Sequence, residues 1–316
     1  MKNLLKSRLL LVIIVIIAII FIGLRMKNNG GVGGIIPSIG NSKNKTVFVQ
    51  VAKQFAVSIP AEWSITEPID GRQTLVYPTG TEIGASDAKT LIDKGVIIIE
   101  TAVNKKDSFD ALIEELKTAA ENDGSKVTVD NKKYGSLKAS KLTVKGENDY
   151  QQIFFDTPTI IIVTSKINHS VFDDIAKSMT IDITKYADNI TKATDLTQQT
   201  RLDITSSNYS NIYKSSSENL KGQKSEAEFS DLLDNVSADF DNNVVVWGVY
   251  INANKGLGTA ANILEGDIII RRSSFYYTIE NDNYLLDAMR VSGRIKPADA
   301  DNTDNTEGAE TPATNE

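Results

Sequence analysis

Hydrophobic residues follow three patterns along this chain, and each pattern predicts a different kind of element. The first is an unbroken run of sixteen apolar residues, 9–24, between Arg8 and Arg25. As a helix this run would span roughly 24 Å, and the two arginines can reach the lipid headgroups and extend the usable length. The run therefore predicts a transmembrane helix that contacts the lipid bilayer through residues 9–24.

A cleaved signal peptide is the alternative interpretation of the same segment. However, the apolar run is longer than the core of a usual signal peptide, and Arg25-Met26-Lys27 follows it where a small-residue cleavage site would stand. More basic residues precede the run than follow it, which favours a cytoplasmic N-terminus within residues 1–27. The pattern predicts a signal-anchor, single-pass protein of the cell membrane with its bulk outside the cytoplasm.

The second pattern is an alternation with a period of two, which is typical of strands. It begins in residues 47–51 and 55–59, and Pro60 ends it. Further strands are expected in residues 75–77, 95–103, 126–129, 137–144, 150–155 and 159–165. Two helices interrupt them, one with Ser108 as its N-cap and one that opens with capping-box spacing at Ser170. Residues 46–183 therefore predict an α+β domain built as an antiparallel sandwich.

The third pattern places helices before strands. It follows a helix-like passage over residues 183–200, where we expect a domain boundary. Tyr209, Ile212 and Tyr213 have helical spacing, and Ser225 opens a capping box. Strands are expected in residues 244–251, 257–264, 268–275 and 284–291. This order predicts an α+β roll over residues 186–293, in which a curved antiparallel sheet covers the helices.

Two further segments lack the residues that a core requires. Residues 28–45 are rich in glycine and predict a flexible linker, and residues 294–316 predict an acidic, disordered tail. The chain has a net charge of −7; all 41 acidic residues lie beyond residue 27, whereas five of the 34 basic residues lie within residues 1–27. Nucleic acid is therefore not an expected partner. The absence of cysteine excludes thiol nucleophiles, disulfides and a lipoprotein anchor.

Residues 55–63 read Phe-Ala-Val-Ser-Ile-Pro-Ala-Glu-Trp, and strands, a helix, a hairpin pair and a closing helix near Met179 follow. This arrangement resembles the PsbP family. The resemblance implies a PsbP-like antiparallel α/β/α sandwich, in which Pro60 ends a strand and Trp63 fills the sheet edge. It also implies a non-enzymatic binding or assembly module.

The later part of the chain resembles the nuclear transport factor 2-like (cystatin-like roll) superfamily, which is seen in many exported bacterial proteins. The resemblance is carried by the order of its elements and by residues 211–216, 229–233, 276–277 and 284–286. None of these residues forms a catalytic motif. The resemblance therefore implies a fold and no particular reaction.

Three sequence features could indicate chemistry, and a structural interpretation is favoured for each. His169 is the only histidine and precedes a helix, as an ordinary polar residue can. Gly256 and Gly258 have dinucleotide-loop spacing, but no helix of sufficient length follows them, so a hairpin turn explains them better. Residues 239–243 resemble half of a calcium loop, but Val244 stands where glycine is required, so we expect a solvated turn. We therefore expect no catalytic residue, metal ion or cofactor.

An aromatic group in the second domain is the candidate pocket. In the strand over residues 244–251, we expect Val245, Trp247, Val249 and Ile251 to face the helix that contains Phe229, Leu232 and Leu233. The candidate pocket residues are Trp247, Tyr213, Phe275 and Tyr277, with Tyr276 nearby. Two alternatives stay open: a closed aromatic core, or an open apolar pocket that binds a ligand.

These observations predict a membrane-anchored extracytoplasmic protein that acts as a non-catalytic binding or assembly module, with an envelope protein as its partner. The alternative is a small-molecule enzyme, a hydrolase or an isomerase, with its pocket in the second domain. An enzyme would need at least two acidic side chains in one concave site. The candidate acids are Asp231, Glu265, Asp267 and Asp287.

The anchor makes the first testable prediction. We expect the mature protein to fractionate with membranes and to retain its N-terminal peptide, because residues 9–24 stay in the bilayer. Cell fractionation followed by N-terminal sequencing measures both properties. A soluble form that begins between about residues 28 and 40 would contradict the single-pass assignment.

Overall fold

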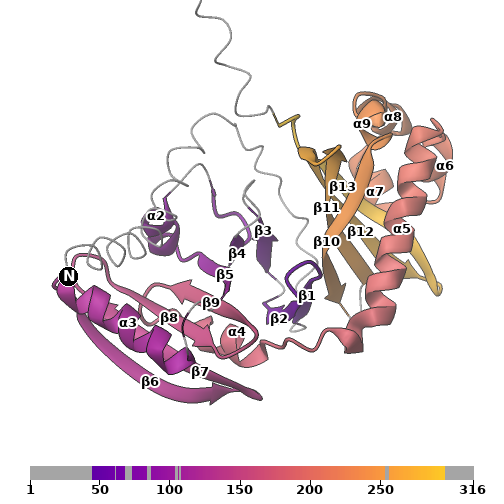
Figure 1. Ribbon diagram of the computed structural model, residues 1–316. Coiled ribbons are helices and arrows are strands. Elements are labelled where there is room, and N and C mark those ends of the chain that lie inside the picture. Colours follow the sequence, from indigo (N-terminus) through magenta and orange to yellow (C-terminus); the bar gives the residue numbers. More distant parts are fainter. Residues whose placement is uncertain are drawn as a thin grey trace, which may run out of the picture.

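The described residues form two antiparallel sheets, with helices on their outer faces and one short helix between them (Figure 1). The structure is a computed structural model and describes residues 45–60, 62–67, 73–83, 87–103, 106, 108–252 and 256–295. Its architecture confirms the α+β class that the sequence predicts. The predicted transmembrane segment 9–24 and most of the predicted linker and tail lie outside the described residues.

The larger sheet has seven strands in the order β3-β4-β5-β9-β8-β7-β6. Its strands are β3 (Trp63–Thr66), β4 (Gln73–Pro78), β5 (Ile97–Val103), β6 (Lys126–Tyr134), β7 (Leu137–Lys145), β8 (Tyr150–Phe155) and β9 (Thr159–Ser165). Helices α2 (Ala88–Asp93) and α3 (Phe109–Asn122) pack on one face, and α4 (Phe172–Ser178) packs on the other. This is the layered α/β/α arrangement expected for the first domain.

The other sheet has six strands in the order β13-β12-β11-β10-β1-β2. Its strands are β1 (Thr46–Gln50), β2 (Phe55–Ile59), β10 (Asn243–Asn252), β11 (Gly256–Glu265), β12 (Ile268–Glu280) and β13 (Asn283–Val291). The β1–β2 hairpin comes from the start of the chain, yet β1 pairs with β10, with Phe48 opposite Tyr250 and Val49 opposite Val249. The division into domains 46–183 and 186–293 stays a prediction, but the six-stranded sheet contains strands from both ranges.

Helices cover the outer face of the six-stranded sheet (Figure 1). They are η2 (Thr184–Tyr186), α5 (Ala187–Thr205), α6 (Tyr209–Lys214), α7 (Glu218–Gln223), α8 (Glu226–Asp234) and α9 (Ser237–Phe240). Phe229 and Leu233 of α8 pack with Phe275 of β12, while Ala193 of α5 packs with Val49 of β1. The predicted order of helices followed by strands is confirmed, with the hairpin as an addition that the sequence pattern does not reveal.

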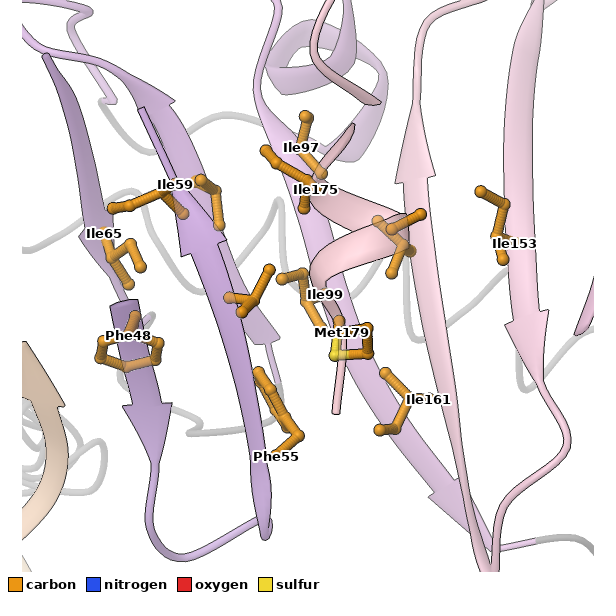
Figure 2. Close-up of a cluster of buried hydrophobic side chains, with 14 of the residues drawn as sticks. Phe48, Phe55, Ile59, Ile65, Ile97, Ile99, Ile153, Ile161, Ile175 and Met179 are labelled. Carbon is orange, nitrogen blue, oxygen red and sulfur yellow. The ribbon is translucent and has the colours of Figure 1, made fainter. Parts of the chain in front are cut away.

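A single core joins the two sheets. Phe48 and Phe55 of the hairpin are fully buried, and they belong to the same apolar cluster as Ile99 of β5, Ile175 of α4 and Trp247 of β10. Figure 2 shows side chains from the hairpin, from α4 and from the seven-stranded sheet gathered in this cluster. The inner face of the six-stranded sheet is therefore covered by the rest of the protein.

A buried polar group lies beside this core. Glu67, which follows β3, is 6 % exposed and accepts hydrogen bonds from the side chains of Gln50 on β1 and Thr74 on β4. Lys53, in the turn of the hairpin, forms an ion pair with the same carboxylate at 3.0 Å. The Tyr250 hydroxyl of β10 also donates to the Ile65 carbonyl of β3, at 3.2 Å. These bonds hold the two sheets in one relative position, because a buried carboxylate is stable only when it is paired.

Local sequence signals predict the starts of some helices and fail at others. Ser108 accepts a hydrogen bond from the Ala111 amide, and Ser225 forms the expected capping box with Glu228. The Ser170 cap is wrong: α4 begins at Phe172, and the Val171 amide is bonded instead to Nδ1 of His169. An unprotonated ring nitrogen can accept a hydrogen bond from a backbone amide at the start of a helix, as a serine oxygen would.

Short elements were missed. Neither β3 nor α7 is among the predicted elements, although Ser217 caps α7 by accepting a hydrogen bond from the Leu220 amide. Trp63 lies on β3, which is an edge strand as expected for a residue that fills a sheet edge, but its side chain is only partly buried. The α7 sequence, Glu-Asn-Leu-Lys-Gly-Gln, has one large apolar residue and therefore no periodic apolar stripe.

The shared core makes the second testable prediction. Phe48→Ala should lower the free energy of unfolding by about 3–5 kcal/mol, as phenylalanine deletions in cores do. Because Phe48 contacts residues of both sheets, the loss should affect both together. Single-tryptophan variants, Trp63→Phe and Trp247→Phe, allow fluorescence to report each sheet during chemical denaturation. Two separate transitions, of which only one shifts in Phe48→Ala, would contradict a shared core.

Candidate functional site

The four predicted pocket residues are divided between two cores. Tyr213, Phe275 and Tyr277 belong to the cluster under the helices. Trp247 is 7 % exposed and belongs to the cluster between the sheets, where its ring meets Phe48 edge-on at 6.0 Å. The structure therefore does not bring Trp247 together with the other three residues.

A β-bulge explains why Trp247 faces the other way. The β10–β11 register shifts between Val246 and Gly248, so Trp247 has no partner on β11. An extra residue reverses which alternate positions face each side of a strand. Val244 consequently packs under the helices, whereas Val245 is 43 % exposed. The expectation that Val245 and Trp247 share the helix-facing side with Val249 is therefore wrong.

The three residues that stay together form closed packing. Phe275 is fully buried, and the Tyr277 hydroxyl is hydrogen-bonded to Oγ1 of Thr200 at 3.0 Å. Burial raises the pKa of Tyr277 to about 12, so this hydroxyl stays protonated at neutral pH. Tyr213 packs against Phe229 with 5.8 Å between ring centroids and donates to the Lys224 carbonyl at 2.8 Å. These contacts lead from the aromatic core to a groove on the surface.

The groove lies between helices α7–α8 and the edge strand β13. Its volume is about 150 Å³, and it is open to solvent. It is lined by Leu220, Gln223, Lys224, Phe229, Leu232, Asp287, Ala288, Met289 and Arg290. Four of these residues are consecutive on β13. Successive side chains of a strand point to opposite faces, so the groove follows the edge of this strand rather than one face.

The outward hydrogen-bonding groups of β13 can be assigned from its neighbours. The Ser292 amide donates inward to the Arg272 carbonyl of β12, and alternate residues of an antiparallel strand point the same way. Ala288 and Arg290 therefore point inward, while the amide and carbonyl groups of Met289 and Val291 point away from the sheet. At the other end of the groove, the Ser217 amide donates to the outward Leu286 carbonyl at 3.0 Å.

This edge differs from the other sheet edges in the described residues. Strand β2 is bridged to Thr180, which follows α4, and β3 has only four residues. Strand β6 exposes Lys126 and Lys133. Bridging, short length and lysine side chains each prevent the addition of another strand. Between Asp287 and Val291, β13 has neither a bridge nor a lysine, but a β-bulge at Asp287 interrupts its pairing with β12.

Charge at the groove is positive on balance. Asp287 is the acidic lining residue, and its carboxylate accepts hydrogen bonds from Ser217 Oγ at 2.6 Å and from Asn219 Nδ2 at 3.1 Å. Lys224 is exposed at the helical rim, and Arg290 lies on the strand side. Hydrogen bonds from Ser225 lower the pKa of the nearby Glu228 carboxyl, and Lys224 lies close enough to add to this effect.

Tyrosine residues surround Arg290 on the side of the core. Burial lowers the pKa of its guanidinium, and the neighbouring tyrosines, first Tyr276, oppose that effect. Burial also raises the pKa of Tyr77 to about 12 and that of Tyr250 well above its ordinary value. These hydroxyls are neutral at physiological pH, where an arginine guanidinium carries its charge in any case.

The four candidate acids of the enzyme alternative do not converge in the described residues. Asp287 lines the groove, but Glu265 forms an ion pair with Arg294 at 3.0 Å. Asp231 and Asp267 are exposed and do not line the groove. Across the described residues, no group of three or more histidine, cysteine, aspartate or glutamate side chains could hold a metal ion.

The remaining motifs have structural roles. Gly256 and Gly258 lie in β11, on the hairpin with β10, and a Cβ on Gly256 would stand 1.8 Å from the Tyr277 carbonyl oxygen. Asp239 is not the solvated turn residue expected: it is 9 % exposed and forms an ion pair with Arg271. Both features serve the packing of β12 against its neighbours.

Nothing in the sequence pattern indicated the groove as a site. Phe229 and Leu232 were expected to be core residues, and the outward position of Met289 depends on which strand pairs with which. Ser217 is the one residue whose type could have indicated a nearby helix start, because it is the N-cap of α7.

The helices of the described residues can be checked for the length and apolar character that a membrane span requires. None of the helices within them is long and apolar enough to cross a membrane. The predicted anchor precedes these residues and stays a prediction.

Comparison with solved structures finds a similarity over part of the chain. No family model matches the chain, and no curated protein matches it. The solution structure of cyanobacterial PsbP (CyanoP) from Synechocystis sp. PCC 6803 is similar at 12 % sequence identity and a TM-score of 0.31, over 46 % of this chain and 99 % of that chain. A similarity of this size carries no conclusion about function. The resemblances to the PsbP and nuclear transport factor 2-like groups stay predictions.

His169 makes the third testable prediction. Its ring is half-buried, Nε2 bonds to the Gly95 carbonyl at 3.0 Å and Nδ1 accepts from the Val171 amide, so the neutral ring fits both partners. Burial lowers its pKa, and the Lys166 cation adds to the effect. Stability should be complete above the unfolded pKa of about 6.5 and should fall as pH drops through the lowered folded value.

Thermal unfolding at a series of pH values measures this loss. The His169→Gln variant is the control, because its side chain does not titrate. Between about pH 7.5 and pH 5, the parent should lose more stability than this variant. Equal losses in the two proteins would show that the histidine does not contribute.

Proposed function

We propose that this protein is a membrane-anchored extracytoplasmic module that binds a polypeptide partner, as an assembly factor does, without catalysing a reaction. The anchor rests on the apolar run 9–24 and its basic flanks. The binding role rests on one observation: a groove lies along the edge strand β13, whose amide and carbonyl groups at Met289 and Val291 point away from the sheet. A partner in the cell envelope would add a strand to this edge and place side chains in the groove.

The backbone of β13 supports strand addition. Met289 and Val291 direct their amide and carbonyl groups outward, so an added strand can form the hydrogen bonds of an ordinary sheet. Leu232 and Met289 line the groove and would contact alternate side chains of that strand. Main-chain bonds would supply affinity, and the groove would supply specificity.

The arrangement of acids gives less support to the enzyme alternative. A hydrolase or isomerase would require a second acid or base beside Asp287, whereas the other charged lining groups are Lys224 and Arg290. The same groove is well suited to holding an extended chain.

Photocrosslinking in the native envelope makes the fourth testable prediction. A photoreactive phenylalanine at Leu232, which is 36 % exposed on the groove, should form an adduct with a second protein. Leu202 is the matched control, because it is also an exposed leucine on a helix, at 52 %, and does not line the groove. Adducts of equal yield at both positions would contradict a specific site.

Two substitutions at Met289 separate strand addition from simple apolar contact. Met289→Pro removes the outward amide, which an edge strand tolerates, and should abolish the Leu232 adduct. Met289→Ala keeps the amide and should retain much of the adduct. Circular dichroism of both variants checks that they remain folded. An undiminished adduct in folded Met289→Pro would exclude strand addition at β13.

A further inference from the structure

One end of the six-stranded sheet combines partly covered apolar side chains with the point where the described chain begins. Antiparallel pairing brings the start of β1 to the end of β10, and the β12–β13 hairpin reaches the same end through β11. The start of α5 packs over this end in the same cluster. The strand-end patch consists of Val47, Tyr186, Ile190, Ile251, Ile279 and Tyr284.

The strand-end patch is apolar and incompletely buried. Ile279 is 39 % exposed and lies opposite Tyr284 on β13. The other five residues of the patch are each partly buried, around a small closed core that contains Val49 and Val249. Because this apolar surface is gathered at one place, covering it with another apolar phase would lower the free energy.

Two tyrosines of the patch each lie beneath a lysine. Nζ of Lys185 is 5.0 Å from the centroid of the Tyr186 ring, and Nζ of Lys192 is 5.4 Å from that of Tyr284. Tyrosine rings are enriched at the interface between a bilayer and water, and a lysine stem can cover apolar surface while its ammonium stays in water. Both tyrosines therefore have surroundings that suit this interface.

Charge at this end does not favour anionic lipid. The two lysines are outnumbered in the same segments by four acidic residues, Asp182, Asp188, Glu280 and Asp282. Contact with a bilayer would consequently come from the apolar and aromatic side chains, and a neutral lipid would suffice.

The covalent connection of the patch indicates the bilayer as its occupant. The described residues begin at Lys45, directly before β1, so the segment that follows the predicted anchor joins the protein beside Val47. As a flexible chain, the 20 residues 25–44 would have an end-to-end distance of about 25 Å. A linker of this length would keep the patch at a high effective concentration near the membrane.

The opposite end of the sheet has a different character. Ile268 begins β12 and lies eleven residues from Ile279, or roughly 35 Å along the strand. The chain leaves the described residues at this opposite end, where the Ile295 amide donates to the Ile270 carbonyl. The predicted acidic tail therefore starts from the end that lies away from the strand-end patch.

We infer that the strand-end patch rests on the extracytoplasmic surface of the bilayer that holds the anchor; this inference rests on the membrane anchoring in the proposed function. Ile279, Tyr186 and Tyr284 contact the headgroup region, and the protein extends away from the membrane along β12. The groove beside Met289 lies farther along β13 and stays accessible to a partner.

Fluorophores at single cysteines test the inference, and make the fifth prediction. The chain has no cysteine, so Ile279→Cys and Ile268→Cys each accept one nitrobenzoxadiazole label. Both isoleucines are exposed on β12, at 39 % and 53 %. The full chain is reconstituted in phosphatidylcholine vesicles with or without brominated acyl chains, which quench nearby fluorophores. Quenching should be at least about threefold stronger at position 279, because interfacial groups lie about 5–10 Å into the headgroup boundary.

A charge placed in the patch provides the matched variant. The label is moved to Asn283→Cys, which is exposed at the start of β13. Adding Ile279→Asp should lower the quenching of this label at least about twofold, because an ionised carboxylate resists transfer out of water. Ile268→Asp is the control and should leave the quenching unchanged. Circular dichroism checks that both variants remain folded.

The outcomes separate the inference from the proposed anchor. Equal quenching at positions 279 and 268 would overturn the inferred orientation. A blue-shifted but unquenched label at position 279 would show that a polypeptide, such as a second copy of this chain, covers the patch, and would also overturn the inference. If neither label is quenched but the protein floats with the vesicles, the docking is wrong and the anchor stands. If the protein does not float with the vesicles, both fail.

Discussion

The β1–β2 hairpin is the element on which the rest of the structure depends, because it is buried on both faces. Phe48 and Val57 pack into the core between the sheets, while Val49 and Ala56 pack under α5. A strand that is covered on both sides stabilises both layers at once, and its removal would expose two apolar surfaces. The first strands of the chain therefore hold its last strands in place through the pairing of β1 with β10.

Polar groups fix the orientation that apolar contact leaves open. Hydrophobic burial is nondirectional, so the two sheets could slide past one another without further constraint. Glu67 prevents this, because its carboxylate needs Gln50, Lys53 and Thr74 at once, and these residues come from the hairpin and from the seven-stranded sheet. A buried ion pair adds little net stability, but any shift that separates Glu67 from its donors is costly. The buried polar group at Glu67 consequently determines the relative position of the two sheets more than it contributes to their stability.

Local signals in the sequence predict much of the secondary structure. The caps at Ser108 and Ser225 act between residues a few positions apart, and most strands follow from their period of two. Contacts between distant residues are different. The alternation in the hairpin indicates one buried face, and nothing local shows that β10 would cover its edge. The bulge at Trp247 likewise depends on pairing with β11, and it reverses the faces of the strand on which the pocket prediction relied.

The candidate site is a consequence of the same pairing. Because the hairpin occupies the free side of β10, and Thr180 bridges β2, the six-stranded sheet is closed at one edge and open at the other, β13. The sequence pattern can classify the groove residues as core or surface positions. It cannot show that they lie together along an open edge, because that depends on the order of the strands in the sheet. The chain enters the sheet at β1, four strands from β13, or about 19 Å at ordinary strand spacing. A strand added to β13 would thus extend the sheet on the side away from β1 and the hairpin.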